Sequence, residues 1–366
     1  MVPQGRLFAS PARYVQGPGV LETLGSQLSR FGSRPILVVD AAVRDLIGDR
    51  VLASCAQDGL EALLVEATGE ITYAAVAELA ERCSSEDVSV VVGLGGGKVL
   101  DTAKALSGHL RVPVVTVPTI ASNDSPTSSA IAMYDDEHHL VAVDMLPANP
   151  ALVLVDTQLI ASAPASFLRS GIGDAVAKVF EAEGCARGTG VTPLGTRPLG
   201  MALAIGRACF DTLWADAVQA LADCEAGRVS EPLERVVEAV ILMSGLAFEN
   251  GGLSLAHSLT RGLMRVDGAR TLMHGYHVGW GALVQVVAEG RPDEEVRQLV
   301  DFLTSVGLPV SSADLALAEP WRDQHAVIAE ATMTAPHLAN LPMRISSEDI
   351  MGAIAEVDRL AGLRSS

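Results

Sequence analysis

The chain has 366 residues, which at roughly 150 residues per domain is long enough for two domains with sizeable apolar cores. Hydrophobic residues make up 49% and charged residues 19% of the chain, a composition that fits neither a disordered nor a fibrous protein. The 44 acidic residues outnumber the 26 Lys and Arg residues and give a net charge of -18, which repels nucleic acid backbones and anionic lipid. We therefore expect a globular protein with no nucleic acid partner.

The cysteines and the apolar runs indicate a compartment. The five cysteines are odd in number and widely spaced without a C-x-x-C pair, so they form neither a disulfide framework nor a zinc finger and favour a reducing environment. The opening residues lack the apolar core of a signal peptide, and no run reaches the roughly 18 apolar residues of a membrane span. We predict a cytoplasmic protein with no membrane partner.

Short apolar runs in the first half of the chain predict a parallel sheet. Continuous apolar strands of this kind are buried on both faces, and the stretches between them, such as residues 72–83, have the spacing of crossover helices. Residues 128–134 and 140–145 flank the polar run DDEHH and predict a hairpin that extends the same sheet. The five predicted strands of the sheet lie at residues 35–40, 62–66, 88–94, 112–118 and 152–156.

Helical patterns replace strand patterns after about residue 163. Val236, Val237, Val240 and Ile241 lie on one face of a helix that begins near Pro232. Residues 184–200 are rich in Gly, Pro and Thr and predict a loop between helices. We predict an α/β domain over residues 1–162 and an all-helical domain over residues 163–366.

The run VSVVVGLGGGKVLDTAKAL predicts a buried strand, three glycines at 95 to 97 and a helix that opens at Lys98. Glycines let backbone N–H groups approach a ligand, and a helix N-terminus attracts the negative charge of a diphosphate. The alternative is a tight turn from strand to helix without a ligand. The usual G-x-G-x-x-G after the first strand is missing, so this is not an ordinary dinucleotide fingerprint.

Asp40 ends the first predicted strand. A carboxylate at this place can accept hydrogen bonds from ribose hydroxyls and repels a 2′-phosphate, which favours NAD over NADP. The alternative is a plain helix N-cap, a common place for Asp.

Two histidines and an aspartate are candidate metal ligands. His257 and His274 lie in apolar helical stretches, where an imidazole is costly unless it is paired or bound. Asp174 shares one helical face with Lys178 and Glu181, so an ordinary ion pair with Lys178 is the alternative to a ligand role. Spacing alone does not decide between metal ligands and ordinary core residues.

Taken together, these segments resemble the glycerol dehydrogenases, within the iron-containing alcohol dehydrogenase and dehydroquinate synthase-like superfamily. The likeness runs through GLGGGKVLDTAKAL, PTIASNDSPTSSAIAMY, SGIGDAVAKVFEA, LMSGLAFENGGLSLAHSL and the HG of LMHGYHVGWG, and the PTIAS-x-D-x-PTS block is specific to this branch. The resemblance implies a Rossmann-like α/β N-terminal domain and an all-α C-terminal domain, the dehydroquinate synthase-like fold. It also implies a homo-oligomer, commonly an octamer.

The resemblance also implies roles for single residues. Asp174, His257 and His274 would bind one catalytic metal, which is zinc in this branch, and Asp124 would contact the substrate. His277 is a candidate for proton release, with a surface or stacking histidine beside Trp280 as the alternative. The predicted NAD-binding set is Asp40, Gly96, Gly97, Lys98, Asp101, Thr119, Ser122, Ser128, Ala130 and Tyr134.

Three departures from the family pattern flank the presumed ligands. Thr260 stands where the family has a second histidine, Tyr276 and His277 replace a charged pair, and Asn123 replaces a smaller hydroxyl residue. The expected activity is zinc-dependent interconversion of a secondary alcohol of a polyol and its ketone with NAD, on glycerol or a related diol, sugar alcohol or cyclitol. The alternatives are a dehydroquinate synthase-like sugar phosphate cyclase and a non-catalytic dinucleotide-binding protein. The cyclase needs several basic residues around a substrate phosphate, and near the presumed ligands this chain offers mainly Lys178, Arg261 and Arg265.

Overall fold

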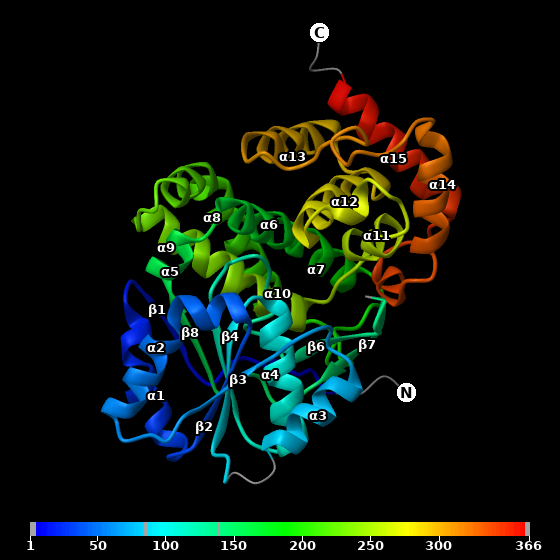
Figure 1. Cartoon of the computed structure of the whole chain (residues 1–366). Coiled ribbons are helices and arrows are strands. Elements are labelled where there is room, and N and C mark those ends of the chain that lie inside the picture. Colours follow the sequence, from blue (N-terminus) through cyan, green and yellow to red (C-terminus); the bar gives the residue numbers. More distant parts are fainter. Residues whose placement is uncertain (1–4, 84–86, 138, 363–366) are drawn as a thin grey trace.

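The computed structural model describes residues 5–83, 87–137 and 139–362. A parallel sheet with helices on its faces forms the lower part of the molecule in Figure 1, and a bundle of helices lies above it. The sheet ends in sequence with Asp156, after which the described residues form helices and loops. The predicted architecture of an α/β part followed by an all-α part is confirmed.

Six parallel strands form the main sheet, in the order β1-β8-β5-β4-β2-β3. All five predicted strands are present within two residues of their predicted bounds, and the four central ones are buried at every position, as their continuous apolar sequences require. The strand that the sequence did not predict, β1, lies at the edge of the sheet, where its residues are only partly buried. The strands are β1 (Tyr14–Gly17), β2 (Pro35–Val39), β3 (Leu63–Glu66), β4 (Val90–Gly95), β5 (Val114–Pro118) and β8 (Leu152–Asp156).

Alternate side chains of the sheet pack on helices of opposite faces. Val90 and Val92 belong to the buried cluster that includes residues of α1 and α2, whereas Val91 packs with residues of α3 and α4. Each strand therefore needs apolar residues at successive positions. These helices are α1 (Leu24–Leu28), α2 (Ala41–Gln57), α3 (Tyr73–Cys83) and α4 (Gly97–Leu110).

The predicted hairpin forms, but it does not extend the main sheet. β6 (Ala130–Tyr134) and β7 (Leu140–Met145) pair antiparallel as a separate two-stranded sheet. Ile131 and Met133 of β6 pack with Ile71 and Val76, so the hairpin docks against the side of the α/β part rather than beside an edge strand. Residue 138, in the predicted polar turn, lies outside the described residues.

The helical part departs from prediction at one loop. The helix predicted near Pro232 begins at Glu231, with the Ser230 hydroxyl accepting a hydrogen bond from Leu233 N at 3.2 Å. The loop predicted at 184–200 is shorter, because α7 continues to Arg187 and uses Gly184 for a close approach to Glu289 rather than as a helix end. The helices are α5 (Thr157–Ser162), α6 (Ala165–Val176), α7 (Lys178–Arg187), α8 (Gly200–Glu225), α9 (Glu231–Glu238), a π turn (Ala239–Met243), α10 (Ser244–Gly251), α11 (Leu255–Leu263), α12 (His274–Ala288), α13 (Asp293–Ser305), α14 (Trp321–Thr332) and α15 (Ser347–Gly362).

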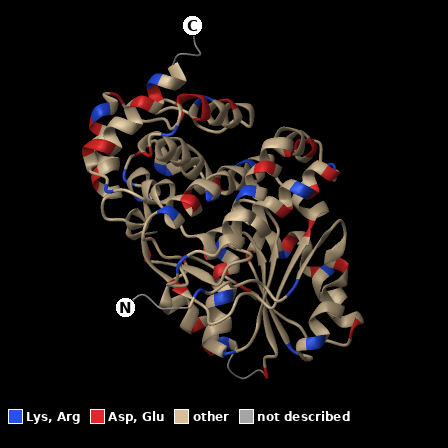
Figure 2. Cartoon of the chain, turned by 180° about the vertical axis from the view of Figure 1, so that it is seen from behind, with Lys and Arg blue, Asp and Glu red and all other residues tan. Residues whose placement is uncertain are grey.

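Charged side chains lie mainly on the outer helices, with both signs mixed, as Figure 2 shows. All five cysteines are free and buried, so no disulfide contributes to the fold. Among the described residues no single helix is long and apolar enough to cross a membrane. One bent pair, Glu231–Gly251 with Leu255–Leu263, meets the length and composition requirement, and its apolar side chains belong to the main buried cluster of the helical part.

Candidate functional site

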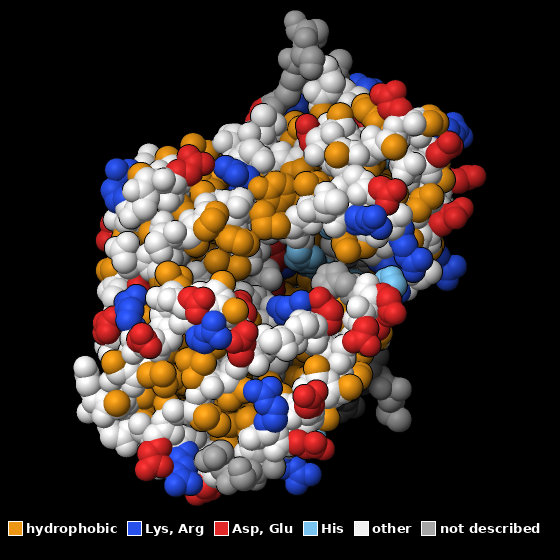
Figure 3. All heavy atoms as spheres, in the orientation of Figure 1, with side chains coloured by type: hydrophobic (Ala, Val, Ile, Leu, Met, Phe, Trp, Pro, Cys, Tyr) orange, Lys and Arg blue, Asp and Glu red, His pale blue; other side chains and the backbone are white. Residues whose placement is uncertain are grey.

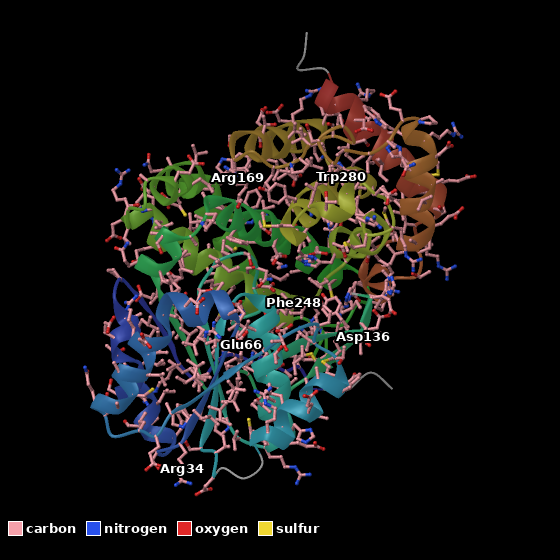
Figure 4. All side chains as sticks on the ribbon, in the orientation of Figure 1. Arg34, Glu66, Asp136, Arg169, Phe248 and Trp280 are labelled. Atoms are coloured by element: carbon pink, nitrogen blue, oxygen red, sulfur yellow. The ribbon has the colours of Figure 1, made fainter. Side chains whose placement is uncertain are left out.

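The glycine-rich run joins β4 to α4 and opens onto a cavity of about 370 Å³. Asp40, Gly96, Gly97 and Lys98 line this cavity together with Glu66, which Figure 4 labels near the boundary between the sheet and the helical part. The volume is typical of a small-molecule site, and the first turn of α4 offers backbone N–H groups and partial positive charge to an anion. The structure therefore brings four of the predicted cofactor residues together.

The glycines serve packing as well as the cavity. A Cβ atom on Gly95 would lie 2.7 Å from the Cβ of Val99, so this glycine lets α4 pack closely on β4. Gly96 and Gly97 line the cavity, and Cβ atoms there would meet side chains of the loop that follows β5 at 3.0 Å. The tight-turn interpretation holds for Gly95, and the other two are available to a ligand.

Asp40 caps a helix and lines the cavity at the same time. Its Oδ1 accepts a hydrogen bond from Val43 N at 2.8 Å, which is the N-cap role that the sequence left open. Its place on the cavity wall is compatible with the ribose role, which stays a prediction.

The cavity at the glycine run is the candidate dinucleotide cradle, and the loop that follows β5 runs from it to the helical part. Thr119 N donates to Gly95 O at 3.1 Å, beside the glycine run. Further along, Ser122 O accepts from Ser170 Oγ at 3.1 Å, and Ser128 is buried. Thr119, Ser122 and Ser128 of the predicted NAD-binding set thus lie on one loop that spans the two parts of the molecule.

Asp101 of α4 holds this loop through hydrogen bonds. Its Oδ1 accepts from Ser125 Oγ at 2.6 Å and from Lys104 Nζ at 3.1 Å, and its Oδ2 accepts from Ala132 N at 3.0 Å. Lys104 also donates to Ala130 O at 2.9 Å. Asp101 and Ala130 are therefore engaged with other protein groups and shape the loop.

Tyr134, the last residue of β6, completes the predicted cofactor set. Burial, together with the nearby charges of Asp101 and Glu70, raises the pKa of its phenol. The hydroxyl therefore stays protonated at neutral pH and able to donate a hydrogen bond.

Asp174, His257 and His274 come together although 17 to 100 positions separate them in sequence. Asp174 Oδ1 lies 3.2 Å from His257 Nε2 and 3.9 Å from His274 Nε2, and the three ligand atoms are all within 4.8 Å of one another. Desolvation by the surrounding protein lowers the pKa of His274 to about 4, so its ring is neutral and offers a lone pair. The three residues can share one metal ion.

Close helix crossings bring these ligands together. A Cβ atom on Gly275 of α12 would lie 1.6 Å from Ser170 O of α6, so only glycine lets these helices cross where His274 can reach Asp174. In the same way a Cβ atom on Gly281 would lie 2.6 Å from Ala256 O, next to His257 on α11. The metal geometry is thus set by backbone contact between helices.

Glu181 orients His257, a role that the sequence did not reveal. This fully buried carboxylate accepts from His257 Nδ1 at 2.6 Å, from His257 N at 3.0 Å and from Ser254 N at 2.8 Å. A carboxylate that binds one ring nitrogen directs the other toward a metal. The sequence signal was that Glu181 shares a helical face with Asp174, but nothing in it indicated the distant histidine.

The Asp174–Lys178 ion pair, which the sequence left open as the alternative to a ligand role, forms as well, inside the same cluster. Lys178 Nζ lies 2.6 Å from Asp174 Oδ1 and 3.1 Å from Asp124 Oδ2. Burial alone would raise the pKa of Asp174, but Lys178 and His257 hold it well below its usual range, whereas burial dominates at Asp124 and raises its pKa. Burial alone would lower the pKa of Lys178, but the carboxylates of Asp124 and Asp174 raise it. Asp124 therefore stands beside the metal-ligand cluster, and its substrate contact stays a prediction.

His277 is buried rather than at the surface. It is 2% exposed, and its Nε2 donates to Ala269 O at 2.7 Å. This hydrogen bond ties α12 to the preceding turn and gives the ring a structural partner.

The ligand cluster lies in the hollow between the two parts of the molecule. Figure 3 shows histidine side chains at the floor of this hollow, and the side chain of His274 is 46% exposed. The cavity of about 370 Å³ lies over the glycine run instead.

Comparison with known proteins identifies the family. The model of the iron-containing alcohol dehydrogenases matches residues 11–157. Glycerol dehydrogenase of Pseudomonas putida is 36% identical, with 97% of this chain and 98% of that protein aligned. The chain belongs to the glycerol dehydrogenase family. It is an NAD-dependent alcohol dehydrogenase within the iron-containing alcohol dehydrogenases.

Two further relatives of this glycerol dehydrogenase family bear on fold and substrate. The crystal structure of glycerol dehydrogenase from Schizosaccharomyces pombe superposes with a TM-score of 0.94 at 32% identity, over 98% of this chain and 92% of that one. Glycolaldehyde reductase of Halobacterium salinarum is 35% identical, with 97% of both chains aligned. Proteins with different substrate names therefore stand at nearly equal identity to this chain.

Proposed function

We propose that the chain is a zinc-dependent oxidoreductase that interconverts a secondary alcohol of a polyol and its ketone, with NAD as hydride acceptor. The convergence of Asp174, His257 and His274 in the hollow beside the dinucleotide cradle is the main support for this proposal. One carboxylate and two imidazoles suit zinc, and they leave a coordination position open for a water or substrate oxygen, as catalytic zinc sites require.

The chemistry divides between bound groups and protein side chains. A divalent metal at this place acts as a Lewis acid that lowers the pKa of a hydroxyl, and NAD accepts the hydride. Glu181 holds the His257 ring in position, and Asp124, whose side chain is 14% exposed, is placed to hydrogen-bond a substrate hydroxyl. The loop that carries Thr119 and Ser122 orients the nicotinamide against the substrate carbon. We assign no proton-transfer step to His277.

The cradle favours NAD over NADP. Asp40 and Glu66 both line the cavity, so two carboxylates stand where a 2′-phosphate would approach if the adenosine end lies at the ends of β2 and β3. Lys98 is paired with Glu70 at 2.6 Å and is the cation nearest the first turn of α4, where the diphosphate is expected.

Three residues that depart from the family pattern near the ligands and Asp124 have partners within the protein. Thr260 Oγ1 donates to His257 O at 2.6 Å within its own helix, and Asn123 Oδ1 accepts from Ser125 N at 3.1 Å in the loop that carries Asp124. Tyr276 packs against the main apolar cluster. We propose glycerol or a related diol, sugar alcohol or cyclitol as substrate.

A sugar phosphate cyclase is the weaker candidate. Of the three basic residues that the sequence offers near the presumed ligands, Arg261 donates to Thr334 O at 2.8 Å at the surface and Arg265 is exposed, which leaves only Lys178 in the cluster. A non-catalytic dinucleotide-binding protein has no need of the converging ligands.

The test combines metal analysis with an activity screen. We expect about one zinc per chain and NADH formation with at least one member of a series of glycerol, vicinal diols, sugar alcohols and cyclitols. The His257→Ala and His274→Ala variants should lose zinc and activity while NAD affinity changes little, because the cradle lies on the other part of the molecule. Stoichiometric zinc in either variant would contradict the ligand assignment.

Compartment and assembly stay predictions. The free, buried cysteines fit a reducing compartment, and we propose the cytoplasm. A homo-oligomer of eight chains is expected from the family, and light scattering on the purified protein measures it.

A further inference from the structure

The chain is nearly devoid of lysine. It contains three lysines against 23 arginines, so its surface cations are almost all arginines. Lysine is ordinarily a surface residue, yet Lys104 and Lys178 are among the largest fully buried side chains, and Lys98 lines the dinucleotide cavity. A lysine retained in the interior of such a chain needs a specific reason at each position.

Lys104 has a structural reason. Its ammonium donates to Asp101 Oδ1 at 3.1 Å, to Ser125 O at 2.6 Å and to Ala130 O at 2.9 Å, and so fastens the loop after β5 to α4. None of these acceptors belongs to the metal-ligand set.

Lys178 is different, because its contacts are made at ligand atoms. Its Nζ lies 2.6 Å from Asp174 Oδ1 and 3.1 Å from His257 Nε2, the two atoms that a metal ion would take, and its side chain is 1% exposed. A zinc ion about 2.1 Å from Asp174 Oδ1 would lie no more than about 4.7 Å from this ammonium if the lysine stayed in place. A divalent and a monovalent cation would then share one small site.

The charges show what each cation does there. The buried carboxylates of Asp174 and Glu181 and the partly buried carboxylate of Asp124 lie within one cluster, and Lys178 is the lysine that faces them. Without a metal ion, the ammonium offsets part of this negative charge. When a metal ion binds Asp174, the ammonium still has Asp124 Oδ2 at 3.1 Å as a partner, and the Phe248 ring, 5.9 Å from Nζ, lies nearby. Figure 4 labels Phe248 where the two parts of the molecule meet.

We propose that Lys178 is a built-in competitor for the metal site: its ammonium occupies the ligand atoms of Asp174 and His257 in the metal-free enzyme and yields them to the metal ion. Lys178 thereby lowers the affinity of the site for the metal ion. When the metal ion is bound, the ammonium keeps Asp124 as its partner. This inference rests on the metal site of the proposed function and adds to it a residue that opposes metal binding.

The test measures zinc affinity rather than activity. Metal-free wild type, Lys178→Met and Lys178→Gln are titrated with zinc against a chromophoric chelator, with Lys104→Met as the matched control for removing a buried lysine. We expect both Lys178 variants to bind zinc at least ten-fold more tightly than wild type, and the control to bind it within about two-fold of wild type. Equal or weaker zinc binding by the Lys178 variants would overturn the proposal, since the lysine would then support the ligands instead of competing for them.

A second measurement covers variants that do not fold without metal. Such variants are purified with zinc bound, and the rate at which a chelator removes the zinc is compared with wild type. Slower removal supports the proposal, and equal or faster removal rejects it. If wild type binds no zinc at all, the proposed function itself fails, whereas zinc binding that depends on His257 but not on Lys178 rejects only the competitor role.

Discussion

A buried carboxylate that is not in the metal-ligand set determines whether one ligand is in position. Glu181 lies on α7 one turn beyond Lys178, and Asp174 lies near the end of α6; the helical spacing in the sequence shows their shared face. The partner of Glu181, His257, is 76 positions away, so pairing between them depends on how α7 and α11 pack. Local periodicity predicts which side chains share a face, but not which distant ring they meet.

We expect Glu181→Gln to weaken zinc binding about ten- to one hundred-fold, because the amide is a poorer partner for His257 Nδ1. The measurement is zinc affinity by chelator competition. Glu183→Gln, two residues away and paired at the surface with Arg207 and Arg291, is the control and should bind zinc like wild type. An unchanged affinity in Glu181→Gln would show that His257 is oriented by its helix alone.

Asp40 carries two roles that substitution can separate. Asp40→Asn keeps an N-cap oxygen for Val43 N and removes the charge, whereas Asp40→Ala removes both and should cost about 1 kcal/mol of stability. We expect both variants to lose at least ten-fold of the preference for NAD over NADP, with only the alanine variant melting at a lower temperature. The ratio of kcat/KM values for the two cofactors, measured beside thermal melting, checks this, and an unchanged ratio would assign the ribose to another residue.

Glycines at helix crossings set the geometry of the metal ligands, because they let the helix backbones come into contact. The sequence predicted the helices of the second half, but it did not indicate which of their glycines lie in crossings, since a glycine inside a helical pattern has no local signature of its neighbour. The same gap explains the loop predicted at 184–200, where Gly184 lies inside α7. The hairpin was predicted as a pair but placed in the wrong sheet, because its docking depends on contacts with Ile71 and Val76.

Gly275→Ala should separate α12 from α6, because the added methyl group would lie 1.6 Å from Ser170 O. We expect a loss of about 3 kcal/mol or more in the free energy of unfolding and at least ten-fold weaker zinc binding, as His274 moves away from Asp174. Chemical denaturation and chelator competition measure the two effects. Gly352→Ala in α15, where no atom lies within 4 Å of the new methyl group, should leave zinc binding unchanged and add up to about 1 kcal/mol of stability. Wild-type zinc affinity in Gly275→Ala would mean that the helices can shift without moving the ligand.

The two parts of the molecule are joined through the loop that follows β5. Thr127 Oγ1 donates to Ile241 O in the π turn at 2.6 Å, and Glu249 of α10 accepts from Ser129 N at 2.9 Å, from the Ser129 hydroxyl and from Asn149 Nδ2. The sequence predicted the α/β and helical parts and their order, because buried strands and helical periodicity are local signals. It did not show that the loop between the fifth and sixth strands fastens one part to the other.

Glu249→Ala should therefore weaken the cofactor end of the site and spare the metal end. The substitution leaves Ser129 N and the Ser129 hydroxyl without their buried acceptor, for a cost of about 3 kcal/mol in the free energy of unfolding, and it frees the loop that carries Thr119 and Ser122. We expect NAD affinity to fall at least ten-fold while zinc stoichiometry stays at the wild-type value, because the three ligands lie on helices of the other part. Glu231→Ala, which removes the same charge at a side chain that is 87% exposed, controls for the change in net charge. The His257→Ala variant should show the reverse pattern, loss of zinc with NAD binding retained. The two variants together therefore test whether the cofactor end and the metal end of the site are separable. Loss of zinc in Glu249→Ala would show that the two ends are one cooperative unit.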